Sequence, residues 1–230
     1  MFRAVLFDFN GVLVDDEPLH FELFRRVLAE EGLDLSEEEY QAEYLGFDDR
    51  GCFTAVFERA GRAVEAAKLA RLLARKSTYY QEWIRRNGYP FFAGAVDLVR
   101  EAANSGAVLG VVSGALRDEV EGALMQEGLR DLCKFLVTAD DVAASKPDPE
   151  SYRTALTLLN SMPPLPERLI HPHEVLVIED SPAGLASAHA CGLTTVAVGH
   201  TYSREELPEA TAYVESVAAC GWEEMVRRAS

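Results

Sequence analysis

The sequence has few cysteines, and those present are far apart. They are Cys52, Cys133, Cys191 and Cys220, and no two of them form a C-x-x-C pair. A disulfide scaffold needs a denser set of cysteines, and zinc or thiol redox sites need closer spacing, so this distribution argues against both. We therefore expect reduced thiols and a cytoplasmic protein.

Long hydrophobic runs and an excess of positive charge are also missing. No apolar stretch reaches the roughly 18 residues of a membrane-spanning helix, and Asp8 interrupts the apolar run near the start. We therefore expect neither a signal peptide nor a membrane partner. The formal net charge is -16 at pH 7, whereas nucleic-acid binding needs stripes of Lys and Arg. A small anionic substrate is still compatible with this charge, because one nearby cation outweighs a diffuse surface charge.

Short apolar runs recur along the chain and predict the strands of a parallel sheet. Each run is continuous rather than alternating, which is typical of strands that helices cover on both faces. Helical patterns that end in glycine separate these runs. The predicted fold class is therefore α/β, with a Rossmann-like parallel sheet. The predicted strands are residues 3–8, 107–114, 134–140, 174–180 and 194–199.

Residues 15–87 interrupt this rhythm, because they contain four helical patterns and no clear strand. The simplest interpretation is a helical module inserted after the first strand, with the Gly- and Pro-containing segment 87–94 as the return linker. We therefore predict a Rossmann-like core of residues 1–14 and 88–230, and a helical insertion of residues 15–87. The C-terminal tail predicts a short edge strand followed by a helix.

Polar residues follow several predicted strands, and the carboxyl ends of parallel strands meet at one edge of a sheet. Clustered carboxylates repel one another unless a cation joins them, so the acids predict a hard divalent ion such as Mg²⁺. Asp8 would then attack phosphorus and form an aspartyl-phosphate. Lys146, the Ser113 hydroxyl and the Gly114 N–H would bind the phosphate oxygens. The polar residues at these ends are Asp8, Ser113, Asp140, Asp141, Lys146, Glu179 and Asp180.

Four segments, in this order, resemble the motifs of the haloacid dehalogenase-like (HAD) hydrolases: DFNGVLVD, VVSGA, SKPDPE and VIEDSPAG. The resemblance covers essentially the whole chain, and the inserted module resembles the helical C1-type cap of that family. Within the family, the sequence is similar above all to sugar-phosphate phosphatases and beta-phosphoglucomutases. The resemblance therefore implies a Rossmann-like core, a cap, Mg²⁺ as cofactor and a small phosphorylated metabolite as substrate.

The resemblance also implies a role for each matching residue. Asp8 is the nucleophile, Ser113 binds phosphate, and Lys146 steadies both the nucleophile and the phosphate. A cis peptide bond is implied between Lys146 and Pro147, which an X-Pro bond tolerates. The implied metal ligands are Asp8, the backbone carbonyl of Asn10, Glu179 and Asp180.

Three residues of the inserted module match positions that reach the substrate or the acid/base residue in the phosphoglucomutase-like members. They are His20, Arg50 and Lys76. The alternative for Arg50 and Lys76 is an ordinary solvated helix face. The alternative for His20 is a purely structural role.

Two other groups have a plainer interpretation. His171 and His173 precede a predicted strand, at the end of the sheet opposite the acids, so we expect an ordinary loop there rather than a metal site. The aromatic residues Tyr79, Tyr80 and Trp83 are expected to form packing within the cap.

Position 10 departs from the family pattern, which usually has an aspartate there to protonate the leaving oxygen and then activate water. Asn10 can form hydrogen bonds but cannot exchange a proton at neutral pH. Losing a general acid/base costs about 10²–10⁴ in rate. Four explanations stay open: a substrate with a good leaving group, such as an acyl or aryl phosphate; proton transfer by His20; deamidation of Asn10 before Gly11; or an impaired chain that binds without turnover.

Other reaction types in the family fit the residues less well. Dehalogenases place a tyrosine at this position and use no metal, which the carboxylates of Glu179 and Asp180 argue against. Phosphonate-cleaving members form a Schiff base with a cap lysine. This chain has Arg50 in the relevant loop, and an arginine cannot form that adduct, while Lys76 is a weaker candidate.

We therefore predict an Mg²⁺-dependent phosphatase that acts on a small phosphorylated metabolite, with a sugar phosphate as the expected class. One alternative is a beta-phosphoglucomutase-like phosphomutase, which Asn10 disfavours because a mutase must return the phosphoryl group with acid/base help. The other alternative is a low-turnover ligand-binding or regulatory relative. We expect a cytoplasmic monomer or weak dimer with no nucleic-acid or membrane partner.

Overall fold

The computed structural model describes residues 2–230. These residues form two compact units. We call residues 2–15 together with Pro90–Ser230 the core unit, and Asp16–Tyr89 the insert unit.

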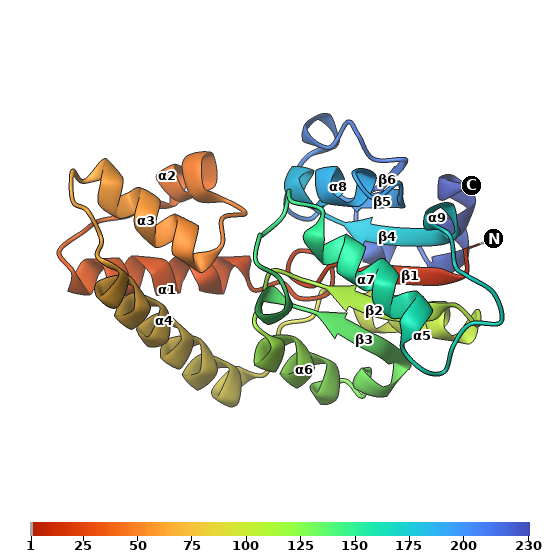
Figure 1. Cartoon of the computed structure of the whole chain (residues 1–230). Helices are drawn as coiled ribbons and strands as arrows, with labels where there is room; N and C mark the ends of the chain where they lie inside the picture. Colours follow the sequence, from red (N-terminus) through yellow and green to blue (C-terminus); the bar gives the residue numbers. More distant parts are fainter. Residues whose placement is uncertain (1) are drawn as a thin grey trace. The chain divides into compact units, whose positions relative to one another are not determined.

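The core unit is built on one parallel sheet with the strand order β3-β2-β1-β4-β5-β6 (Figure 1). Every residue of the neighbouring strands β1 and β4 is buried, as the continuous apolar runs predict. The predicted α/β class with a parallel sheet is therefore confirmed. The strands are β1 (Ala4–Phe7), β2 (Val108–Val112), β3 (Cys133–Val137), β4 (Val175–Glu179), β5 (Thr194–Val198) and β6 (Ala212–Val214).

The strand order reverses between β1 and β4. β1 pairs in parallel with β2 on one side and with β4 on the other, where Phe7 is the partner of Ile178. Ligands of open α/β sheets bind at the carboxyl ends of the strands at such a reversal. The residues that directly follow β1 and end β4 therefore stand where this fold builds a site.

Helices pack on this sheet in two groups. α7 and α8 contact each other, and Tyr152 of α7 packs with Leu6 and Val177 in one hydrophobic cluster. α5 contacts β2, and α9 contacts β5 and β6. These helices are α5 (Ala95–Asn104), α6 (Arg117–Gln126), α7 (Glu150–Ser161), α8 (Pro182–His189) and α9 (Trp222–Ala229).

The pair Ser181-Pro182 in the sequence is typical of a helix start, and α8 begins there. Ser181 is the N-cap residue, and its hydroxyl accepts a hydrogen bond from the Gly184 N–H at 3.1 Å. Pro182 takes the first helical position, where its missing N–H costs nothing. Short 3-10 turns complete the core unit: η2 (Arg130–Leu132), η3 (Ala139–Asp141), η4 (Pro172–Glu174), η5 (Arg204–Glu206) and η6 (Val217–Ala219).

The insert unit is helical throughout its regular structure. It consists of α1 (Glu17–Glu30), α2 (Glu37–Glu39), the π-helical turn η1 (Tyr40–Tyr44), α3 (Asp49–Arg59) and α4 (Ala66–Asn87). Its core is aromatic, with Phe24 packed edge-on against Phe53 at 5.1 Å between ring centroids. The second of the four helical patterns covers residues 36–46. It differs from expectation, because only its first turn is α-helical and the rest is the π turn η1. Both tyrosines of that turn are buried, and the Tyr40 hydroxyl donates to Glu17 Oε1 at 2.6 Å.

Two groups predicted to have ordinary structural roles, the cap aromatics and the histidines before β4, lie as expected. Tyr80 is buried and packs with Tyr79 and Trp83 in one hydrophobic cluster, as expected for internal packing. His171 and His173 lie at the turn η4 before β4, with their rings stacked at 5.7 Å, so they occupy the predicted loop.

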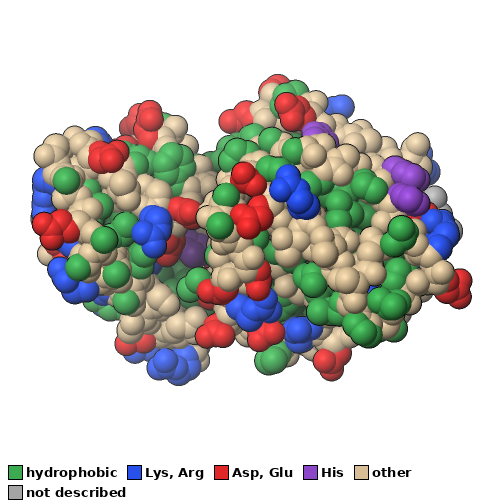
Figure 2. Space-filling model, in the orientation of Figure 1, with side chains coloured by type: hydrophobic (Ala, Val, Ile, Leu, Met, Phe, Trp, Pro, Cys, Tyr) green, Lys and Arg blue, Asp and Glu red, His purple; other side chains and the backbone are tan. Residues whose placement is uncertain are grey.

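Charged side chains of both signs lie on the surface (Figure 2). On the face shown in Figure 2, acidic and basic side chains are interspersed among hydrophobic ones, and no continuous basic band is seen on that face. Over residues 2–230, no helix combines the length and the apolar character needed to cross a membrane.

Candidate active site

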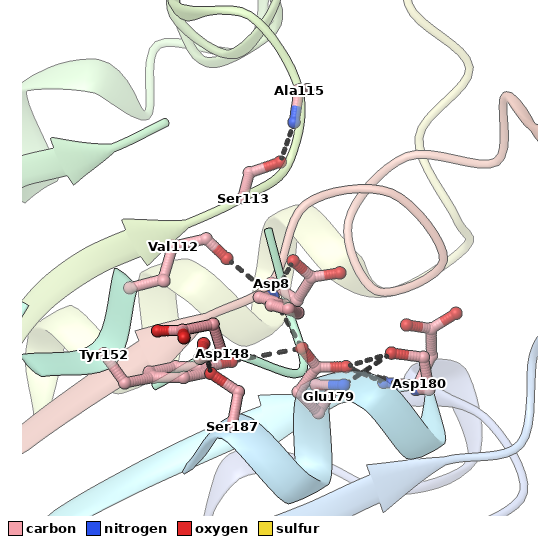
Figure 3. Close-up of polar contacts among 12 residues, drawn as sticks. Asp8, Val112, Ser113, Ala115, Asp148, Tyr152, Glu179, Asp180 and Ser187 are labelled. Carbon is pink, nitrogen blue, oxygen red and sulfur yellow. Dashed lines mark hydrogen bonds and ion pairs between the residues drawn. The ribbon is translucent and has the colours of Figure 1, made fainter. Parts of the chain in front are cut away.

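Asp8 directly follows β1, at the reversal of strand order. Its backbone N–H donates to the carbonyl of Ile178 in β4 at 2.9 Å, which fixes the position of Asp8 beside the end of β4. The residue is 8% exposed. Figure 3 shows its carboxylate beside Glu179 and Asp180, which come from the end of β4 and the residue after it.

Lys146 joins these acids. Its Nζ donates to Asp8 Oδ1 at 2.7 Å and to Glu179 Oε1 at 2.6 Å, and a third bond at 3.1 Å reaches the carbonyl of Val112 at the end of β2. Burial alone would lower the pKa of Lys146, but the charges of Asp8 and Glu179 raise it well above its ordinary value. The lysine is therefore a fixed ammonium group. The peptide bond between Lys146 and Pro147 is cis, as the resemblance implies.

Glu179 and Asp180 are held by the backbone at the start of α8. Glu179 Oε2 accepts from the N–H groups of Asp180 and Ser181 at 3.0 and 3.1 Å, and from the Ser181 hydroxyl at 3.1 Å. Gly184 leaves the space that this carboxylate fills, because a Cβ at that position would lie 1.8 Å from Glu179 Oε1. Asp180 accepts a hydrogen bond from the Thr201 side chain, which follows β5.

The three acids fit a hard divalent cation. One ligand atom from each of Asp8, Glu179 and Asp180 lies within 4.8 Å of the others. Burial and the charge of Glu179 raise the pKa of Asp8 to about 7, against the opposing charge of Lys146. Burial, Glu179 and Asp8 likewise raise the pKa of Asp180 well above its ordinary value. Raised pKa values mean that the negative charge of these buried carboxylates is not fully compensated, and a bound cation would compensate it. Carboxylate oxygens are also ligands that Mg²⁺ prefers.

The loop after β1 approaches this cluster closely. Asn10 pairs with Val14 in an isolated bridge, and Gly11 between them has φ +78°. A Cβ on Gly11 would lie 1.9 Å from Asp180 Oδ2, so only glycine leaves room for that carboxylate. No role for Gly11, Thr201 or Gly184 is predicted from the sequence. The glycines stand inside the motifs, whereas Thr201 lies outside all four motifs and carries no local signal.

Ser113 and Gly114 follow β2. Ser113 is 3% exposed, and its Oγ accepts from the Ala115 N–H at 2.9 Å (Figure 3). A Cβ on Gly114 would meet no atom within 4 Å, so the space beside this backbone is open. Asp140 and Asp141 do not join the cluster. Both bind Arg117, through its backbone N–H at 2.8 Å and its guanidinium at 2.6 Å respectively.

Within the insert unit, Lys76 and His20 are neighbours. Lys76 is 1% exposed, and its Nζ lies 2.6 Å from His20 Nδ1 and 2.5 Å from Asp49 Oδ1. The alternative of a solvated helix face is therefore wrong for Lys76. Its Nζ is engaged by both His20 and Asp49, which argues against a Schiff-base role. Arg50 is exposed at the start of α3.

The other ring nitrogen of His20 faces Asp16. His20 Nε2 lies 3.3 Å from Asp16 Oδ2, and the Tyr80 hydroxyl donates to the same oxygen at 2.7 Å. Burial and the charge of Lys76 lower the pKa of His20, while the charge and hydrogen bond of Asp16 raise it, and the net shift is upward. Both nitrogens of the imidazole thus have partners inside the insert unit.

Comparison with known proteins identifies similar sequences over nearly the whole chain. The sequence profile described as haloacid dehalogenase-like hydrolase matches residues 5–198. A validoxylamine A 7'-phosphate phosphatase from Streptomyces hygroscopicus subsp. limoneus is 28% identical, over 96% of this chain and 97% of that protein. Protein CbbY from Rhodobacter capsulatus is 31% identical, over 88% of this chain and 87% of that protein.

Solved structures agree with these sequence matches. The crystal structure of CbbY from Rhodobacter sphaeroides in complex with phosphate has a TM-score of 0.79 at 27% identity, and covers 95% of this chain and 96% of that chain. A beta-phosphoglucomutase from Clostridium difficile has a TM-score of 0.84 at 21% identity, over 99% and 97% of the two chains, which shows a shared fold. The family predicted from the four motifs is therefore confirmed, and so is the prediction of an enzyme of the HAD-like phosphohydrolase class. The chain belongs to the haloacid dehalogenase-like hydrolase family.

Proposed function

We propose that this protein is an Mg²⁺-dependent phosphatase that acts on a small phosphorylated metabolite, and that the metabolite is a sugar phosphate. The observation that carries the proposal is the cluster at the strand reversal, in which Lys146 holds the Asp8 carboxylate beside Glu179 and Asp180. The phosphatase named above, which is similar over nearly the whole chain, supports the same reaction.

The proposed ion would be held by Asp8, Glu179, Asp180 and the backbone carbonyl of Asn10. When bound, the ion would act as a Lewis acid and offset the negative charge of the phosphoryl oxygens. Lys146 would offset part of the same charge and keep Asp8 oriented. The Ser113 hydroxyl and the Gly114 N–H, at the end of β2, would bind the remaining phosphate oxygens.

In the first step, a carboxylate oxygen of Asp8 forms a bond to phosphorus while the bond from phosphorus to the leaving oxygen breaks. In the second step, water attacks the phosphorus of the aspartyl-phosphate, which releases phosphate and restores Asp8. The leaving oxygen must gain a proton and the attacking water must lose one. Asn10 can do neither, so these two proton transfers are the weak point of the reaction.

These two proton transfers must therefore involve a group other than the Asn10 amide. His20 is the side chain of the insertion best suited to move a proton, but its ring nitrogens face Lys76 and Asp16. A proton that His20 passes on must be replaced through one of those two neighbours. A substrate with a good leaving group would need no proton in the first step, and deamidation of Asn10 would restore the usual aspartate.

We further propose that the insert unit, predicted as residues 15–87, serves as the substrate-selecting cap, and that residues 1–14 and 88–230 carry the chemistry. His20, Arg50 and Lys76 are the residues of the insertion proposed to bind the substrate. Cap closure excludes water from an active site and completes the binding of the substrate.

A second function is favoured by Asn10 itself: a relative that binds phosphorylated sugars with little turnover. One similar solved structure is an aspartate-to-asparagine mutant of CbbY from Rhodobacter sphaeroides in complex with xylulose 1,5-bisphosphate, with a TM-score of 0.81 at 27% identity. A mutase fits less well, since it needs acid/base help to return the phosphoryl group to the sugar.

Hydrolysis of a generic aryl phosphate, with and without Mg²⁺, tests the proposal. The protein and its Asn10→Asp and Asp8→Asn variants are compared. Mg²⁺-dependent release by the unaltered chain, lost in Asp8→Asn, supports the phosphatase. Release by Asn10→Asp alone supports the low-turnover relative, and release that persists in Asp8→Asn refutes the proposed nucleophile.

A further inference from the structure

The environment of Glu179 assigns a role to a tyrosine outside the four motif segments. Glu179 has no exposed surface, and its two carboxylate oxygens have different partners. Oε2 receives the N–H and hydroxyl donors at the start of α8, described above. Oε1 receives Lys146 Nζ at 2.6 Å. It also receives the hydroxyl of Tyr152 at 3.1 Å (Figure 3).

Tyr152 contacts both members of this ion pair. It lies in the first turn of α7, has no exposed surface, and packs with Leu6 and Val177 in the core. Lys146 Nζ stands 5.1 Å from the centroid of its ring. A phenylalanine would fill the same space and offer the same ring face to the ammonium group. A buried hydroxyl costs free energy unless it is hydrogen-bonded, so packing does not account for it and the bond to Glu179 does.

We propose that Tyr152 is a positioning residue whose hydroxyl sets how Lys146 is shared between Glu179 and Asp8. The ammonium group stands between two carboxylate oxygens, at 2.6 Å from Glu179 and 2.7 Å from Asp8. A second donor on Glu179 Oε1 takes up part of the charge of that oxygen and weakens its attraction for Lys146. Without the hydroxyl, Lys146 moves toward Glu179, and the Asp8 carboxylate loses the donor that orients it.

The variant Tyr152→Phe isolates this effect, because it removes one oxygen and keeps the ring. Tyr40→Phe is the matched control: Tyr40 is 2% exposed, and its hydroxyl also donates to a carboxylate, that of Glu17, in the insert unit. Each variant loses one tyrosine hydrogen bond to an acid, which is buried for Tyr152 and partly buried for Tyr40. A change in the Lys146 environment is expected in Tyr152→Phe alone.

Nuclear magnetic resonance of the metal-free protein reads the position of Lys146 without any reaction. The chain has four lysines, Lys68, Lys76, Lys134 and Lys146, so ¹⁵Nζ labelling gives few signals. The signal of Lys146 is assigned by its loss in Lys146→Met. In Tyr152→Phe we expect this signal to shift and its protons to exchange with water about ten-fold faster, as for the loss of one charged hydrogen bond. The Lys76 signal serves as an internal reference.

A Lys146 signal in Tyr152→Phe that matches the unaltered protein overturns the proposal, and so does an equal change in Tyr40→Phe. The consequence for turnover rests on the proposed function. If the phosphatase is active, kcat in Tyr152→Phe falls about ten-fold while KM changes less than about two-fold, and an unchanged kcat overturns that consequence. If the unaltered chain hydrolyses no phosphate ester, the proposed function fails, and the Lys146 signal still decides the role of Tyr152.

Discussion

Replacing Lys146 by methionine removes the one ammonium group that three buried or partly buried acceptors share. Asp8 Oδ1, Glu179 Oε1 and the Val112 carbonyl all lose a donor. Methionine has nearly the same length and no charge, so packing changes little. The experiment therefore isolates the charge.

The size of the effect follows from exposure. Breaking a fully buried ion pair costs about 3–5 kcal/mol, because one charge stays buried without a partner. The Lys146 and Asp8 side chains are 13% and 11% exposed, whereas that of Glu179 is not exposed at all. Water can reach Asp8 in part, and Glu179 keeps its other donors, so we expect the low end, a loss of about 3 kcal/mol in the free energy of unfolding.

Urea unfolding, followed by tryptophan fluorescence with a chelator present, measures this loss. Added Mg²⁺ provides a second reading, since a ligand that binds only the folded state stabilises it by mass action. The ion should stabilise Lys146→Met more than the unaltered protein, because no lysine then competes for the carboxylates. A loss below about 1 kcal/mol, the range of exposed pairs, or equal stabilisation of both proteins by Mg²⁺, would refute the reasoning.

Further predictions concern the space and the charge around the same acids. An alanine inside a helix normally stabilises a protein relative to glycine by about 0.5–1 kcal/mol. Gly184→Ala should instead destabilise the fold by about 1–3 kcal/mol, because its Cβ would overlap Glu179. A higher melting temperature of this variant in thermal unfolding would contradict this. Gly11→Ala should abolish Mg²⁺ binding in calorimetry, because its Cβ would overlap Asp180. Unchanged Mg²⁺ affinity would contradict the close approach of the loop after β1 to Asp180. Asp8 has its pKa raised from 3.8 to about 7, so the folded state binds the extra proton between these values. The metal-free protein should therefore lose stability relative to Asp8→Asn as the pH rises from 4 to 7, and a flat difference would contradict the shift.

The sequence predicts the sheet well because its strands are short and buried on both faces. Continuous apolar runs such as residues 3–8 leave few alternatives to a covered parallel strand, and Ser181-Pro182 marks the start of α8. The second helix of the insertion was less predictable. A single pattern over residues 36–46 does not reveal a change from α to π geometry, which depends on how Tyr40 and Tyr44 pack.

The candidate site was predictable where its residues stand at strand ends and inside motifs. Asp8, Glu179 and Asp180 come together because β1 and β4 are neighbours, which the motif order implies. Site contacts made by residues outside the motifs could not be predicted in this way. Tyr152 is an ordinary apolar position of a helical pattern until α7 places its hydroxyl on Glu179.

In the insert unit, too, contacts between distant segments could not be predicted from the sequence. The segment around Lys76 is equally compatible with a charged, solvated helix face and with a substrate-binding site. Only the approach of α1 and α3 to α4 shows that Lys76 is buried between His20 and Asp49. For the same reason, Asp140 and Asp141 were placed among the clustered acids by their position after β3, although Arg117 binds both.

The central claim is that Asp8 receives the phosphoryl group. Incubation of the protein with Mg²⁺ and acetyl phosphate, acid quenching and peptide mass spectrometry test it directly. We predict a phosphate adduct on the peptide that contains Asp8, which accumulates because Asn10 cannot activate water, and which is absent from Asp8→Asn. Turnover of a phosphate ester with no adduct on this peptide at any time point, or an adduct that persists in Asp8→Asn, would contradict the account.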